Sequence, residues 1–196
     1  MKIRPDAWII SDTHFGHTNI IKYCNRPFRS IEQMEDQLIH NWNKTVSKRD
    51  QVLFLGDFGF GEVHQLKKWA QALNGDIIMI LGNHDRSRST SFWRNEIGMQ
   101  EVYPEPIIYK KFFILSHEPI DWVSPKVPVV NIHGHSHDLD IFNINNHHIN
   151  ICVEQINYTP IRLNSIIKVC AEANEGLIEF NQPPFNQNFI KYVQSE

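Results

Sequence analysis

Five short apolar runs in this chain each stop at a group of Asp, Asn or His residues. Such runs are typical of buried strands. In open α/β sheets, ligands bind beyond the carboxyl ends of the strands, because side chains from several strands converge there. The recurrence therefore predicts an α/β fold with one polar site. In chain order the polar residues are Asp12 and His14, Asp57, Asn83 and His84, His117, and His135 and His137.

The first half of the chain alternates predicted strands with predicted helices. Ser30 and Gln33 stand at the spacing of a capping box, which marks the start of the first long helix. The order strand, helix, strand predicts a parallel pair with a right-handed crossover. The expected strands are Ala7 to Ile10, Val52 to Leu55 and Ile77 to Leu81, and the expected helices are Ile31 to Val46 and Val63 to Leu73.

The second half changes to short runs rich in Ile, Val and Phe, which predict an antiparallel or mixed sheet. A short helix is expected around Ser89 to Glu96 and another near Leu163 to Cys170. The expected strands are Ile107 to Tyr109 paired with Phe112 to Leu115, then Val127 to Ile132, and Ile141 to Ile144 paired with Ile149 to Val153. We expect one domain over residues 1–180 and a surface tail over residues 181–196.

Composition limits the classes of function. A chain of 196 residues is long enough for one ordinary domain. A net charge of -3 argues against tight non-specific binding of nucleic acid. The three cysteines form no C-x-x-C motif, and we expect them to be reduced thiols. The sequence shows neither a signal-peptide pattern nor a run of about 20 apolar residues, so we expect a cytoplasmic protein without a membrane partner.

The predicted site has the chemistry of a metal centre. Carboxylates and imidazoles bind divalent transition-metal ions, and an Asn carbonyl is a neutral oxygen ligand. Seven nitrogen and oxygen ligands exceed what one tetrahedral zinc ion needs, whereas two ions that share a carboxylate would use them all. We therefore expect two divalent ions. Mn²⁺ is the expected metal, with Fe, Ni, Zn and Mg as alternatives.

The residues at these positions also resemble a known family, the calcineurin-like metallophosphoesterases. The motifs D-x-H and G-D alone are weak signals, but five motifs in the family's order across residues 12–137 are specific. Ser116 stands where the family often has glycine. The motifs are Asp12-Thr13-His14, Gly56-Asp57, Gly82-Asn83-His84-Asp85, Ser116-His117 and Gly134-His135-Ser136-His137.

The resemblance implies a fold. It indicates a two-layered sandwich of mixed β-sheets flanked by α-helices. The stretch Ser11 to Phe28 looks like the opening of small single-domain prokaryotic and phage phosphoesterases, a group whose likeness does not specify a substrate.

The resemblance also implies a role for each residue. It assigns Asp12, His14 and His137 to one metal, Asn83, His117 and His135 to the other, and Asp57 to both. His84 would stand beside the scissile phosphate, where it stabilises charge or protonates the departing oxygen, and Asp85 would orient its ring. A hydroxide between the ions would attack phosphorus.

Four further residues could contact substrate from nearby loops. They are His17, Asn19, Arg26 and Arg86. For the first two, stabilising the loop is an equal alternative, and an arginine in a loop is commonly just solvated. His133 is expected to be structural, with a hydrogen bond to a metal ligand as the alternative. We interpret His40, His64, His147 and His148 as surface or core residues.

These features together predict a hydrolase of phosphoester bonds. A phosphodiesterase acting on a nucleotide or another small phosphodiester is preferred, because the chain has little beyond a catalytic core with which to dock a protein. A phosphomonoesterase is the first alternative. A nuclease would need a basic groove or stacking aromatic side chains to hold a strand, and Lys110, Lys111, Arg86 and Arg88 are thin support for it. A non-catalytic binding module would be expected to have lost some of these residues.

Overall fold

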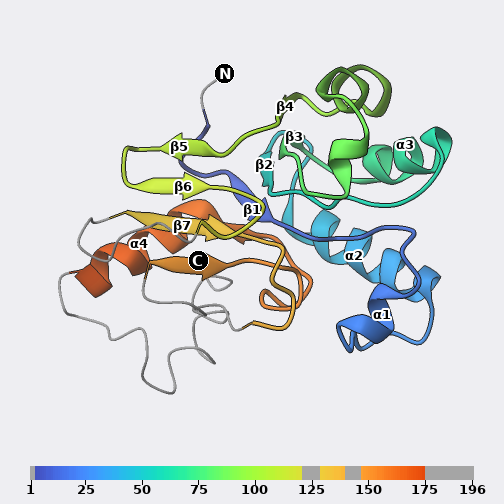
Figure 1. Cartoon of the computed structure of the whole chain (residues 1–196), viewed down its shortest axis with the longest axis horizontal. Coiled ribbons are helices and arrows are strands. Elements are labelled where there is room, and N and C mark those ends of the chain that lie inside the picture. Colours follow the sequence, from blue (N-terminus) through green and yellow to red (C-terminus); the bar gives the residue numbers. More distant parts are fainter. Residues whose placement is uncertain (1–2, 121–128, 140–146, 175–196) are drawn as a thin grey trace.

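Two mixed β-sheets flanked by helices form the fold in the computed structural model, which describes residues 3–120, 129–139 and 147–174 (Figure 1). The strand order is β4-β3-β2-β1-β9 in the first sheet and β5-β6-β7-β8 in the second. This arrangement confirms the predicted α/β sandwich of mixed sheets.

The first sheet contains the three strands predicted in the first half of the chain. Strands β1 to β4 are parallel, and β9 is antiparallel to β1. Strands β4 and β9 were not predicted, because they have only three and two residues and include polar positions. The strands are β1 (Trp8–Ile10), β2 (Gln51–Phe54), β3 (Asp76–Ile80), β4 (Glu101–Tyr103) and β9 (Ile161–Arg162).

The second sheet is mixed, as predicted. Its strands are β5 (Ile107–Tyr109), β6 (Phe113–Leu115), β7 (Val130–His133) and β8 (His148–Asn150). Strands β5 and β6 form the expected antiparallel hairpin, whereas β7 is parallel to both of its neighbours. The expected partner of β8, residues 141–144, lies outside the described residues, and the described partner of β8 is β7.

In Figure 1, helices α1, α2 and α3 lie on one side of the molecule and α4 lies on the other. The helix at Phe92–Ile97 was predicted around Ser89 to Glu96, and it is a π-helix. The four-residue helix α1 was not predicted. The elements are α1 (Ile20–Tyr23), α2 (Ile31–Thr45), α3 (Val63–Ala72), η1 (Asp85–Ser87), η2 (Phe92–Ile97) and α4 (Leu163–Asn174).

Helix α2 shows how the sequence pattern becomes packing. The Ser30 side chain accepts a hydrogen bond from the Gln33 backbone N–H, as the capping pattern predicts. The Gln33 side chain bonds back to the Arg29 N–H instead of the Ser30 N–H. Met34, Leu38 and Trp42 are buried, since residues four apart share one helix face. The helix thereby covers the apolar core that holds the first sheet in place.

Several expectations concern features other than strands and helices. Cys24, Cys152 and Cys170 are free thiols, in agreement with the prediction. The tail predicted over residues 181–196 lies outside the described residues. Within the part of the chain that the structure describes, none of the helices combines the length and the apolar character needed to cross a bilayer.

His133, at the end of β7, is fully buried, and its burial lowers the pKa of the ring to about 4. The unfolded chain therefore binds a proton near pH 6.5 that the folded protein excludes. The contribution of the neutral His133 ring to the free energy of unfolding is therefore fully present above about pH 6.5. This contribution is lost as the pH falls toward 4.

We expect the free energy of unfolding of the wild type to fall by about 2 kcal/mol more than that of His133→Gln between about pH 7.5 and pH 5. Urea unfolding in the presence of a chelator measures the difference. The exposed His40→Gln variant is the control and should follow the wild type. Identical pH dependence in wild type and His133→Gln would contradict the expectation.

Candidate metal centre

The polar residues that follow five strands meet at one place. The parallel pairing of β1 with β2 continues past both strands, because the Asp12 N–H donates to Gly56 O (3.0 Å) and the His14 N–H donates to Asp57 O (3.1 Å). The first sheet supplies the residues that follow β1, β2 and β3. The second sheet supplies those that follow β6 and β7.

One group of side chains consists of Asp12, His14 and His137. The Nε2 atoms of the two histidines are 3.1 Å apart. Asp12 Oδ1 lies 3.8 Å from His14 Nε2 and 3.6 Å from His137 Nε2. Asp12 and His14 are almost completely buried, whereas His137 is 17% exposed. The group combines one residue pair from the first sheet with one histidine from the second.

A second group consists of Asn83, His117 and His135. Asn83 Oδ1 lies 2.8 Å from His117 Nε2 and 3.1 Å from His135 Nδ1. The two ring nitrogens are 3.3 Å apart. Asn83 and His135 are exposed, so this group lies closer to solvent than the first. It also draws on both sheets.

Asp57 lies between the two groups. Its Oδ2 atom is 3.5 Å from His14 Nε2 and 3.5 Å from His117 Nε2. Its Oδ1 atom accepts a hydrogen bond from the His84 N–H (3.1 Å), which fixes the carboxylate. One oxygen is thus equidistant from a ring of each group, the position required of a bridging ligand.

The donor atoms fit a pair of divalent cations. Asp12 Oδ1 is buried and has no hydrogen-bond partner among the described residues. Two ring nitrogens 3.1 Å apart can share at most one proton, so a cation satisfies both better than a hydrogen bond does. The far nitrogen of His117, Nδ1, donates to Leu55 O (2.8 Å), which directs Nε2 toward the cluster.

The pKa values of the clustered side chains also indicate a cation site. Burial would raise the pKa of Asp12, but the neighbouring rings of His14, His117 and His137 outweigh it and lower that pKa below its usual range. Burial likewise opposes protonation of His117, yet Asp57 and Asp12 raise its pKa to about 9. Cation binding would therefore release protons from the cluster, so ion affinity should increase with pH.

The backbone is strained at several of the candidate ligands. Asp12, His14, Asp57 and His135 have φ values of 63°, 51°, 58° and 67°. This left-handed region is uncommon for residues other than glycine and costs on the order of 1 kcal/mol or more for each residue. Such strain clusters at functional sites, where the surrounding structure enforces it.

Two glycines in the motifs are required by close approach. A Cβ atom on Gly82 would lie 2.1 Å from Asp57 Oδ1, and one on Gly134 would lie 2.2 Å from Asp12 Oδ2. Real Cβ atoms essentially never make contacts this short. The glycine before Asn83 and the glycine before His135 are therefore needed because carboxylates pack against their Cα atoms.

His84 lies at the rim of the cluster. Its side chain is 44% exposed, and its Nε2 atom is 3.9 Å from Asp57 Oδ2. Its ring packs against Phe60, with 4.9 Å between ring centroids. His84 is thus near both groups and open to solvent, which suits a residue that meets substrate.

The role expected for Asp85 needs correction. Its carboxylate does not orient the His84 ring, because it accepts hydrogen bonds from the backbone N–H groups of Asp57 (2.7 Å), Phe58 (3.1 Å) and Gly82 (2.9 Å). Burial raises the pKa of Asp85 to about 7, and the nearby Asp57 charge adds to the shift. Asp85 holds together the loops that follow β2 and β3.

The four predicted substrate contacts occupy different environments. Arg26 is buried and donates to the backbone oxygens of Asp12 and Thr13, so its position differs from that of a substrate contact. Arg86 is exposed and lies 3.9 Å from Glu118. His17 packs on Phe60 beside the cluster, with 4.6 Å between centroids. Asn19 is exposed just before α1.

Two neighbours of the cluster were not predicted. Glu154 Oε1 lies 3.0 Å from His137 Nδ1, and the Phe60 ring packs against three histidines, His14, His17 and His84. A signal for Glu154 existed, because it ends the apolar run Ile151 to Val153 in the same way that the predicted ligands end theirs. No comparable pattern in the sequence marks Phe60.

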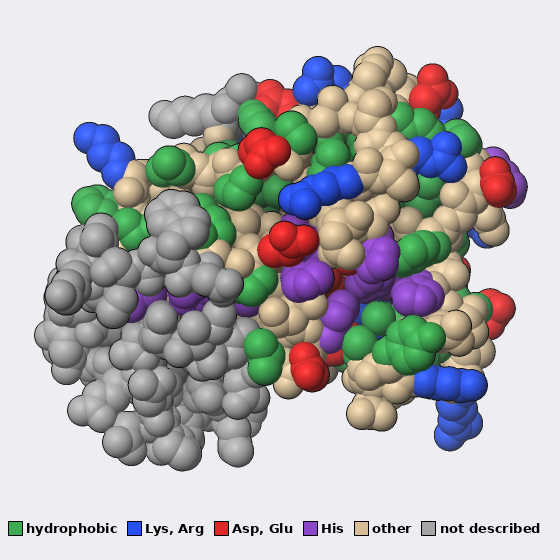
Figure 2. All heavy atoms as spheres, viewed as in Figure 1, with side chains coloured by type: hydrophobic (Ala, Val, Ile, Leu, Met, Phe, Trp, Pro, Cys, Tyr) green, Lys and Arg blue, Asp and Glu red, His purple; other side chains and the backbone are tan. Residues whose placement is uncertain are grey.

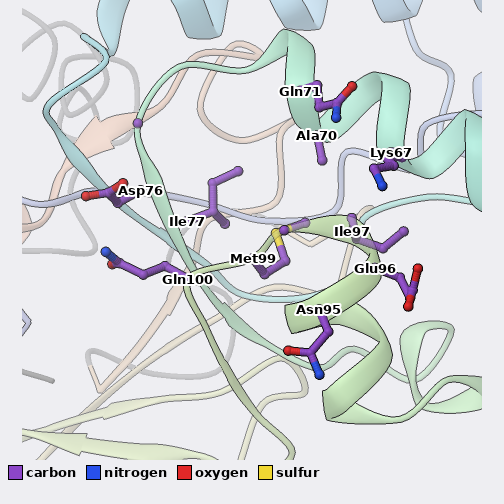
Figure 3. A pocket seen from close by; sticks show the side chains of 12 residues that line it. Lys67, Ala70, Gln71, Asp76, Ile77, Asn95, Glu96, Ile97, Met99 and Gln100 are labelled. Atoms are coloured by element: carbon purple, nitrogen blue, oxygen red, sulfur yellow. The ribbon is translucent and has the colours of Figure 1, made fainter.

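Histidine side chains gather near the middle of the face seen in Figure 2. A separate hollow of about 300 Å³ lies between α3, the start of β3 and the end of η2 (Figure 3). Its lining includes Lys67, Asp76 and Glu96 and none of the residues of the two groups. Asp76 begins β3, whereas the cluster lies beyond the opposite end of that strand.

Comparisons with known proteins agree with the geometry. The model of the calcineurin-like phosphoesterase family matches residues 6–168. An uncharacterised protein of Methanocaldococcus jannaschii is 38% identical over 169 residues, which cover 83% of this chain and 89% of that protein. The gene 66 protein of Mycobacterium phage L5 is 33% identical over 84 residues, 41% of this chain and 40% of the phage protein.

A solved structure is also similar. The crystal structure of a protein of unknown function from Aquifex aeolicus has a TM-score of 0.60 and 27% sequence identity. The match covers 84% of this chain and 98% of that one.

Proposed function

The chain belongs to the calcineurin-like phosphoesterase family, and from this premise we propose that it is a two-metal phosphodiesterase acting on a nucleotide or another small phosphodiester. The family supports metal-dependent hydrolysis of phosphoester bonds. The observation that carries the two-metal assignment is Asp57 Oδ2, which is 3.5 Å from a ring nitrogen of each group.

The residues present would hold the ions as the two groups suggest. Asp12, His14 and His137 would hold one, and Asn83, His117 and His135 would hold the other, with Asp57 shared. When bound, two divalent ions supply positive charge for the phosphoryl oxygens and lower the pKa of a water molecule that serves as nucleophile. Mn²⁺ is our first choice, since imidazole and carboxylate ligands both suit it.

His84 would act on the departing oxygen. It is the one histidine of the five motifs assigned to neither group, and its exposed ring lies next to Asp57. An imidazole ring in this position can deliver a proton to the leaving oxygen. Phe60 and His14 pack against the ring and limit its orientations.

The charges near the site favour a diester over a monoester. A monoester usually carries a second negative charge, which a free arginine or lysine would neutralise. Arg26 is paired with the Glu154 carboxylate (2.8 Å), and Arg86 lies 3.9 Å from Glu118. Both arginines predicted beside the site thus already have acidic neighbours, which suits a substrate with a single charge.

Metal removal and substrate comparison test this proposal together. We expect chelator-treated protein to lose hydrolysis of bis-p-nitrophenyl phosphate and to regain it when two equivalents of Mn²⁺ are added. The kcat/KM for this diester should exceed that for p-nitrophenyl phosphate. A clear preference for the monoester would instead indicate a phosphomonoesterase, and full activity in excess chelator would contradict the metal requirement.

A further inference from the structure

An ion pair with little exposed surface, Arg26 with Glu154, lies next to the Nδ1 atom of His137. Glu154 Oε1 is 3.0 Å from His137 Nδ1 and accepts a hydrogen bond from Arg26 Nε (2.8 Å). The Arg26 side chain has no exposed surface, and that of Glu154 is 9% exposed. The contacts join residues that are 128 and 17 positions apart in the sequence.

The same arginine also supports the Asp12 side of the group. Its terminal nitrogens donate to Asp12 O (2.8 Å) and Thr13 O (3.0 Å). Cys152, two residues before Glu154, donates from its thiol to Asp12 Oδ2 (3.3 Å). Arg26 and the segment from Cys152 to Glu154 therefore back the same group of ligands.

We propose that Glu154 is a positioning residue of the metal centre, which fixes the His137 ring so that its Nε2 faces Asp12 and His14, while Arg26 fixes Glu154. The proposal rests on the two-metal centre proposed above but not on its substrate. The first group thereby has a charged support behind one of its rings, whereas the described partner of His117 Nδ1 in the second group is a backbone carbonyl, that of Leu55.

The chemistry of the contact explains why a carboxylate is used. A ring that donates its Nδ1 proton to a carboxylate keeps Nε2 as the nitrogen that binds metal, and it becomes a more basic ligand. Arg26 occupies the same Glu154 oxygen from another direction, so the carboxylate cannot swing away without leaving a buried charge unpaired. Two contacts on one oxygen thus define its position.

The same atoms also permit an alternative interpretation, a separate metal site. Cys24 Sγ, His137 Nδ1 and a Glu154 oxygen lie within 4.8 Å of one another and could hold an ion of their own. In that case Cys24 would be a ligand, and its loss would remove one ion. Under the proposal Cys24 is not a ligand, so its loss leaves the number of ions unchanged.

The test is Mn²⁺ binding to chelator-treated protein, measured by isothermal titration calorimetry without substrate. Glu154→Gln removes the charge but keeps an acceptor. Glu154→Asp keeps the charge near Arg26 but shortens the side chain by one methylene. We expect one of the two ions to bind about 10- to 100-fold more weakly in at least one of these variants, while the other ion is unaffected.

Turnover at saturating Mn²⁺ should return toward the wild-type kcat, because only the affinity has changed. A merely structural role would lower thermal stability and leave ion affinity unchanged. Glu105→Gln, at an exposed position, is the control for loss of a charge, and Cys24→Ser, at a half-buried position, tests the alternative site. Wild-type affinity for both ions in both Glu154 variants, or an ion lost in Cys24→Ser, would overturn the proposal. The ion affinities are measured without substrate, so this outcome does not depend on whether diesters are hydrolysed.

Discussion

Asp57→Asn is expected to abolish tight binding of at least one ion and to lower turnover by on the order of 10³-fold or more. Asparagine has the same shape as aspartate, and its side-chain oxygen can still accept the bond from the His84 N–H. It removes the negative charge that lies 3.5 Å from both His14 and His117. The variant therefore isolates the bridging charge from the fold.

Metal analysis after dialysis and steady-state kinetics at fixed Mn²⁺ measure the two effects. Asp36→Asn, an exposed acid on α2, is the matched control and should resemble the wild type. Circular dichroism should show an unchanged fold in both variants. Two ions and near-normal turnover in Asp57→Asn would show that this carboxylate does not bridge a metal pair.

The second large effect is expected for His84→Ala, which should retain both ions yet lose about 10²- to 10⁴-fold in turnover. Its ring is assigned to neither ion, so its removal should leave both groups of candidate ligands in place while it removes the proposed contact with substrate and the packing on Phe60 and His14. If the ring protonates the departing oxygen, the loss should be larger for an alkyl leaving group than for p-nitrophenolate, which leaves without a proton.

Steady-state rates for a methyl and a p-nitrophenyl diester, with metal content measured in parallel, separate these cases. His64→Ala removes an exposed histidine of α3 and serves as the control. Equal losses for both leaving groups would favour charge stabilisation over proton donation. Turnover close to that of the control would exclude His84 from the reaction.

The sequence predicted the strands that carry apolar runs and missed those that depend on their neighbours. Strands β1, β2 and β3 carry continuous apolar runs, so their identity is a local property. Strand β9 has two residues, Ile161 and Arg162, and exists because it pairs with β1. No local pattern specifies such a strand.

In the site, too, features that follow from a local sequence pattern could be predicted, and features that depend on distant residues could not. The clustering of the candidate ligands could be predicted because each follows an apolar run, and the structure brings their side chains together. The surroundings of Arg26 could not, because its burial depends on Glu154, far along the chain. The role of Asp85 was wrong because the family resemblance implied a contact with the His84 ring, whereas the Asp85 carboxylate accepts hydrogen bonds from three backbone N–H groups.

Each group of ligands takes side chains from both sheets. Asp12 and His14 follow β1, whereas His137 follows β7, and in the second group Asn83 follows β3 while His117 and His135 follow β6 and β7. A cation held by either group would cross-link the two halves of the sandwich. Ion binding would then favour the folded state by mass action and couple the unfolding of one sheet to that of the other. The centre proposed for hydrolysis would thus also set how cooperatively the protein unfolds.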